Sequence, residues 1–171
     1  MRILLSVGLT GHMAAPTLAT DMEISIEIPK LDVAEYHKPY VAIWLEGPDK
    51  KVAVNLAVWY DVANPKQEGD KWLKDLRQWW RRAGRDLKVP ADGLTSATRA
   101  PGSHTIKFDG GSAAALKNLA GGQYELVVEA AREVGGREVL RLPLQWPPKE
   151  GTSLNAKGEH ELGTVTVDVK P

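Results

Sequence analysis

Apolar and polar residues alternate with a period of two along much of this chain, which is typical of strands that bury one face. The pattern is clearest from Met22 to Ile28, where every second residue is apolar and Pro29 ends the run. The alternation, together with apolar runs bounded by turn residues, predicts seven strands, at 22–28, 40–46, 52–59, 104–109, 123–132, 138–146 and 162–169. Seven strands of even spacing favour an all-β fold, an immunoglobulin-like or fibronectin-like β-sandwich.

Two details of this pattern are specific enough to be checked. In the third strand, the alternation places Leu56 and Val58 on one face and Trp59 on the other. Residues 147–158 begin with paired prolines and are mostly polar, so we expect an irregular loop there.

The periodicity changes to that of a helix between Gly69 and Gly84. Apolar residues there are spaced three and four apart, which places them on one helical face. The residues on this face are Trp72, Leu73, Leu76, Trp79 and Trp80. Asp70 is suited to the N-cap and Gly84 to the position after the C-terminus, so we predict one inserted α-helix of about four turns over residues 70–84.

The composition is that of a single globular domain. Of 171 residues, 43% are hydrophobic and 26% are charged, which are ordinary values for a folded protein. The 22 basic residues balance the 22 acidic residues, which argues against a general nucleic-acid-binding protein. Since cysteine is absent, disulfides, thiolate metal sites and cysteine nucleophiles are excluded. We expect no membrane span, because no apolar run reaches the length that one needs.

The first residues have the composition of a secretory signal. Met1 and Arg2 give a positive start, a mostly apolar stretch follows, and small residues precede a cleavage position after Ala19. A first core strand is the alternative, which His12 and two glycines weaken. We therefore predict a signal peptide over residues 1–19, one sandwich domain over 20–171, and a periplasmic location.

The predicted helix carries the strongest local charge. Six basic and two acidic residues lie between Asp70 and Arg85. Arginine binds phosphate or carboxylate through two parallel hydrogen bonds, and indole rings stack on planar ligands. The candidate binding residues are Arg77, Arg81, Arg82, Trp79 and Trp80. Alternatively, the tryptophans pack on the sandwich and the arginines form a solvated face.

The segment from Asp92 to Thr98 resembles the flavinylation motif of covalent FMN-binding domains. In that motif, an aspartate precedes two variable residues, a serine or threonine, a glycine, an alanine, and the threonine that receives FMN through a phosphoester. Asp92, Thr95 and Ala97 match the motif, as does the acceptor threonine, whereas Ser96 replaces the glycine. The resemblance implies that Thr98 attaches FMN on an exposed loop, with a plain polar loop as the alternative.

A larger part of the chain is similar to a bacterial periplasmic family catalogued as domain of unknown function 2271. The similarity includes the secretory start, the helix rich in Trp and Arg, and the segments 92–102, 108–111 and 122–130. It implies an association with FMN transferases and PepSY membrane proteins in iron-related gene neighbourhoods. The C-terminal half also resembles the Ig-like domain of flagellar hook-capping proteins, which implies a fold and no function.

Two functions remain open from the sequence. The first is an electron-transfer module with covalent FMN on Thr98, which serves a membrane-linked redox or iron-uptake system. Its partners are then an FMN transferase and a PepSY-type membrane protein. The second is a cofactor-free binding or assembly module that docks a membrane or periplasmic partner through the helix. Both are non-catalytic, and the histidines lack metal-ligand spacing. A hydrolase or transferase is disfavoured because no nucleophile–base pair or known catalytic motif is found.

Overall fold

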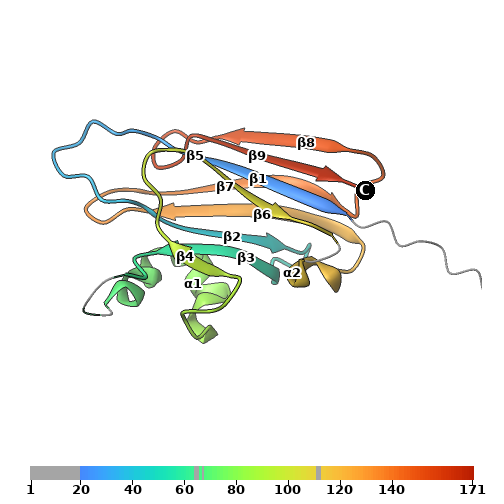
Figure 1. The fold of residues 1–171 in the computed structure, drawn as a ribbon, viewed down its shortest axis with the longest axis horizontal. Coiled ribbons are helices and arrows are strands. Elements are labelled where there is room, and N and C mark those ends of the chain that lie inside the picture. The colour runs from blue at the N-terminus through green and yellow to red at the C-terminus, as the bar shows by residue number, and fades with distance from the viewer. Residues whose placement is uncertain (1–19, 64–65, 67, 111–112) are drawn as a thin grey trace, which may run out of the picture.

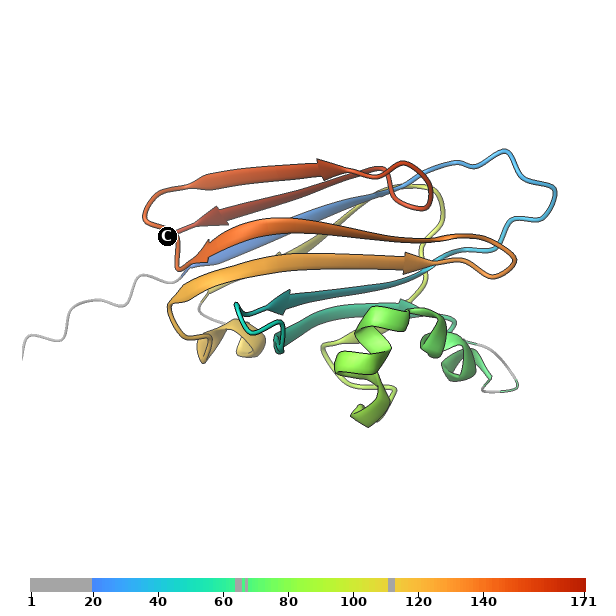
Figure 2. The same ribbon diagram turned by 180° about the vertical axis from the view of Figure 1, so that it is seen from behind.

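The structure is a computed structural model that describes residues 20–63, 66, 68–110 and 113–171. Two sheets pack face to face as a sandwich (Figures 1 and 2). The first sheet has the strand order β5-β1-β9-β8 and is antiparallel throughout. Its strands are β1 (Asp21–Ile28), β5 (Gly102–Phe108), β8 (Thr152–Lys157) and β9 (Thr164–Lys170). The predicted signal peptide, residues 1–19, lies outside the described residues.

The second sheet has the order β4-β3-β2-β6-β7, in which β4 alone pairs in parallel with its neighbour. Its strands are β2 (Tyr40–Glu46), β3 (Val52–Tyr60), β4 (Thr95–Ala97), β6 (Gly122–Ala131) and β7 (Arg137–Trp146). All seven predicted strands are therefore confirmed, and so is the all-β sandwich.

The main core lies between the two sheets and follows from the alternation of the sequence. In β1, the side chains of Met22, Ile24 and Ile26 are at most 1% exposed and face the second sheet. The valines of β9 lie beside them at 0% exposure. A short helix, α2 (Ala114–Lys117), closes this core at one end through Leu116.

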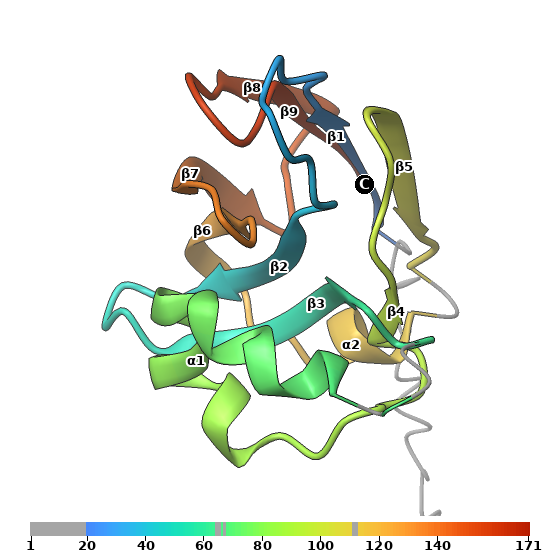
Figure 3. The same cartoon turned by 90° about the vertical axis from the view of Figure 1, so that its left-hand side faces the viewer.

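A helical insert between β3 and β4 covers the outer face of the second sheet, so Figure 3 shows a third layer below the sandwich. The insert consists of the 3₁₀ helices η1 (Gly69–Asp75) and η2 (Gly84–Asp86) and of the α-helix α1 (Arg77–Arg82). It buries a second apolar cluster of Ala42, Trp44, Val58, Tyr60, Leu73, Leu76, Trp79, Val127 and Ala131. The second sheet is therefore buried on both faces.

The prediction of one continuous four-turn helix is wrong. Its first half is a 3₁₀ helix, and Leu76 interrupts the helical backbone with φ −72° and ψ 68°. Leu73 of η1 and Leu76 at the break both belong to the second cluster. The predicted caps also differ, since Asp70 lies inside η1 and Gly84 begins η2.

Two strands were missed, and one was assigned the wrong faces. Residues 152–157 form β8 at the sheet edge, where alternate residues are half-buried, so the expected loop is a strand. In β3, Ile43 pairs with Ala57 and Trp44 with Asn55, which leaves one extra residue in β3. This bulge reverses the alternation, so Trp59 faces the main core. The other missed strand is β4, which contains part of the motif segment.

Among the described residues, no helix is long and apolar enough to cross a membrane.

Candidate functional site

The helical insert is fixed to the second sheet by a buried carboxylate, that of Glu129 on β6. Glu129 is 0% exposed. Its oxygens accept hydrogen bonds from the backbone N–H groups of Gln78, at 3.0 and 3.1 Å, and Trp79, at 2.8 Å. Arg137 on β7 supplies the balancing charge through Nε at 2.6 Å. Glu129 thus caps the first turn of α1 from another element, immediately after the break at Leu76.

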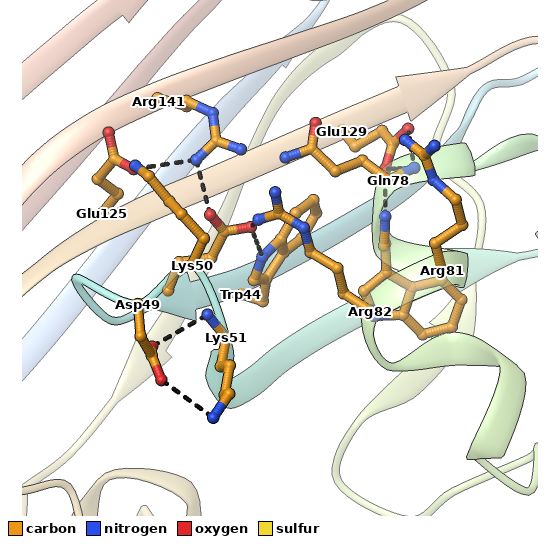
Figure 4. A network of polar contacts seen from close by, with 12 residues as sticks. Trp44, Asp49, Lys50, Lys51, Gln78, Arg81, Arg82, Glu125, Glu129 and Arg141 are labelled. Carbon is orange, nitrogen blue, oxygen red and sulfur yellow. Dashed lines mark hydrogen bonds and ion pairs between the residues drawn. The ribbon is translucent and has the colours of Figure 1, made fainter.

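A second buried carboxylate, that of Glu46, holds one of the predicted binding residues. Glu46 is 0% exposed and accepts hydrogen bonds from Trp44 Nε1 at 2.9 Å, from Arg82, and from Arg141 at 2.8 Å (Figure 4). Burial and the neighbouring Arg141 lower the pKa of Arg82 below its usual range. Arg82 therefore has a structural role, because its guanidinium group pairs with the carboxylate of Glu46.

The predicted aromatic residues of the helix are largely inaccessible to a ligand. Trp79 is 0% exposed, and its Nε1 donates a hydrogen bond to Asn55 Oδ1 at 2.9 Å. Its ring packs so closely on Gly84 that a Cβ there would lie 2.5 Å from a ring carbon. Trp80 is half-buried, with its ring centroid 6.4 Å from that of Trp79. The predicted arginines, Arg77, Arg81 and Arg82, are all exposed.

The motif segment forms a short edge structure where an exposed loop was expected. Thr95 and Ser96 lie in β4, paired with β3. The Thr95 hydroxyl accepts a hydrogen bond from Ala91 N–H at 2.9 Å and lies 3.1 Å from Ala91 O, which closes the turn before β4. Asp92 and Ala97 are exposed. The side chains of the motif are therefore spread over both faces of one edge strand and its turn.

Thr98 follows β4 and is half-buried at the wall of a pocket. Its N–H donates to Tyr60 O at 3.0 Å, which continues the pairing with β3. Its hydroxyl donates to Pro39 O at 2.7 Å. The pocket has a volume of about 350 Å³, and its lining includes Tyr36, Tyr40 and Trp72. The expected acceptor thus lies beside three aromatic side chains from distant parts of the chain.

The polar groups of this pocket are unevenly satisfied. The hydroxyl of Tyr36 is buried, and none of the described residues forms a hydrogen bond with it. Tyr40 donates to Gly69 O at 2.9 Å, and burial raises its pKa to about 12. His37 lies between Glu35 and Glu133, with nitrogen–oxygen distances of 2.9 and 3.5 Å.

Of the site residues predicted from the sequence, Thr98 lines this pocket. The pocket lining includes none of Arg77, Arg81, Arg82, Trp79 and Trp80. Instead, its aromatic side chain from the insert is Trp72, which is 44% exposed. The segment 36–40 supplies four lining residues, Tyr36, His37, Lys38 and Tyr40. It has no periodicity that could have singled it out. Among the described residues, no group of three or more metal-ligating side chains is found.

The chain belongs to the family described as "Predicted periplasmic protein (DUF2271)", whose model matches residues 21–164. This confirms the family resemblance and the periplasmic location predicted from the sequence. Comparison with curated proteins and with solved structures finds no match.

Proposed function

We propose that this periplasmic protein carries FMN covalently on Thr98 and serves as an electron-transfer module of a membrane-linked redox or iron-uptake system. The observation that supports this proposal is a coincidence of two independent features. The threonine that matches the acceptor of the flavinylation motif lies in the wall of a pocket that also contains aromatic side chains. These features are independent, because the motif is a pattern in the sequence and the pocket is a feature of the folded structure.

The charged side chains of the pocket bear on where a phosphate would lie. Lys38 lines the pocket and supplies a positive charge. Asp61, Asp75 and Glu133 add negative charge to other parts of the lining. In this proposal the phosphate lies near Lys38, the lysine of the lining.

Attachment forms a bond between Oγ1 of Thr98 and the phosphorus of FMN. With a flavin dinucleotide as donor, the adenylate leaves and the hydroxyl proton is lost, so the protein gains FMN minus water. The FMN transferase must first displace the hydrogen bond from Thr98 to Pro39 O, which is worth about 1 kcal/mol. Thr98 directly follows β4, which lies at the edge of the second sheet.

In this proposal the redox chemistry belongs to the flavin, and the protein positions it and controls its surroundings. The protein is accordingly a carrier and not a catalyst. A PepSY-type membrane protein is the proposed redox partner.

The test is the intact mass of the protein after secretion together with an FMN transferase. We expect wild type and Thr98→Ser to gain FMN minus water, and Thr98→Val to keep its unmodified mass, because valine has the shape of threonine without the hydroxyl. Ser96→Gly restores the residue of the motif and should raise the labelled fraction. A labelled Thr98→Val protein, or an unlabelled wild type beside a labelled control flavoprotein, contradicts the proposal.

A cofactor-free docking module is the second candidate, and the outer face of the insert favours it. Lys74, Arg77 and Arg81 are exposed there, and none of them forms an ion pair with a described residue. Trp and Arg are enriched at the energetic centres of protein interfaces. If no flavin is found, a charge reversal at Arg77 and Arg81 that abolishes partner binding supports this candidate.

A further inference from the structure

We propose that Trp72 is the stacking platform of the isoalloxazine ring, an assignment that rests on the proposed attachment of FMN to Thr98. The sequence favoured Trp79 and Trp80 for this role. In the structure, Trp79 lies in the second cluster, and neither of the two lines the pocket. Trp72 is the tryptophan that shares the pocket with Thr98.

Trp72 lines the pocket and keeps much of its surface exposed. It is 44% exposed, whereas Leu73 beside it is 1% exposed. Ligand pockets are lined mainly by apolar and aromatic side chains. An indole offers a flat surface of the size that a flavin needs, and offset stacking of aromatic rings is favourable beyond the area it buries.

A lysine lies next to this indole. The Nζ of Lys74 lies 5.7 Å from the centre of the Trp72 ring, and Lys74 is not among the residues that line the pocket. Arg77 and Arg81 continue the exposed positive charge along the insert.

The proposal predicts a spectroscopic property that a merely structural role of Trp72 does not. An indole in contact with a flavin quenches flavin fluorescence by electron transfer to the excited ring. Leucine cannot donate an electron, whereas tyrosine can. Trp80 provides a matched control, because it belongs to the same insert and lies outside the pocket lining.

The experiment compares flavin fluorescence in the folded and the denatured state for wild type, Trp72→Leu, Trp72→Tyr and Trp80→Leu, each secreted together with the FMN transferase. Intact mass first gives the flavin content of each protein. We expect strong quenching on folding in wild type and Trp80→Leu, a brighter folded state in Trp72→Leu, in which quenching by Tyr36 and Tyr40 of the lining remains, and stronger quenching again in Trp72→Tyr.

The outcomes separate this inference from the function on which it rests. If wild type carries no flavin by mass, the proposed function fails and the assignment of Trp72 fails with it. If all four proteins carry flavin and Trp72→Leu is as strongly quenched as wild type, the assignment of Trp72 alone is overturned. The same holds if Trp80→Leu, and not Trp72→Leu, loses the quenching.

Discussion

Replacing Glu129 with glutamine tests how the helical insert is held on the sandwich. The carboxylate is fully buried and accepts bonds from two backbone N–H groups on one side and from Arg137 on the other. A glutamine of the same shape has one oxygen and one NH₂ group. Whichever way it is turned, the NH₂ group faces a donor and leaves that donor unsatisfied.

The size of the effect follows from these contacts. A hydrogen bond to a charged group contributes about 1.5–3 kcal/mol, and a buried donor without a partner costs about 1–3 kcal/mol. Because the side chain of Arg137 is 35% exposed, water recovers part of the loss. We therefore expect Glu129→Gln to lower the free energy of unfolding by about 2–4 kcal/mol, a large part of the stability of an ordinary domain.

The assay is urea unfolding followed by tryptophan fluorescence, with Glu23→Gln as the matched control. Glu23 pairs with Lys107 at 3.1 Å on an exposed strand face, so its loss should cost less than about 1 kcal/mol. Hydrogen exchange at the amides of Gln78 and Trp79 should accelerate in Glu129→Gln before global unfolding. Equal stabilities of the two variants would refute the role of Glu129 as a buried cap.

Two further predictions concern packing and pH. Gly84→Ala should destabilise the protein by about 1–3 kcal/mol, since its Cβ would meet the Trp79 ring, whereas Gly151→Ala, with open space around it, should be nearly neutral in the same urea assay. Burial by itself raises the pKa of Glu138, but the backbone N–H groups of residues 159–162 donate to its carboxylate and lower that pKa below 4.5. A carboxylate whose pKa is lower in the folded than in the unfolded state stabilises the fold at pH values above its unfolded-state pKa. This stabilisation is lost as the pH falls through its folded-state pKa. The stability difference between wild type and Glu138→Gln should therefore be constant near neutral pH and shrink below about pH 4.5.

The strands could be predicted because one face of each lies against the core. The alternation in β1, for example, is visible in the sequence and corresponds directly to buried and exposed residues. β8 escaped prediction because its inward residues are only half-buried and its apolar pattern is weak. The bulge in β3 has no local signal, since it depends on pairing with β2.

The helical insert shows how tertiary contacts override a local pattern. The spacing of apolar residues correctly indicated a helical segment that packs on the sandwich. Directly after the break at Leu76, the first N–H groups of α1 donate to Glu129, which lies far away in the sequence. The sequence does contain a signal, because Glu129 is a charged residue inside the apolar run of β6, and a buried carboxylate must find partners.

Of the residues that line the pocket, Thr98 is the one that the sequence reasoning proposed as a site residue. A motif of seven residues indicated Thr98, because the chemistry of attachment requires a hydroxyl among small neighbours. The remaining wall comes from the segment before β2 and from η1, and no spacing in the sequence relates Tyr36 or Trp72 to Thr98. Such a pocket is defined by the fold and becomes visible only with the structure.

The most direct test of the account is the mass of the tryptic peptide Val89–Arg99, which trypsin releases by cleavage after Lys88 and after Arg99. The peptide should be prepared from protein secreted together with an FMN transferase. We predict that it is heavier by FMN minus water and that fragmentation places the added mass on Thr98. A peptide of unmodified mass, or an added mass on Thr95 or Ser96, would contradict the proposed function.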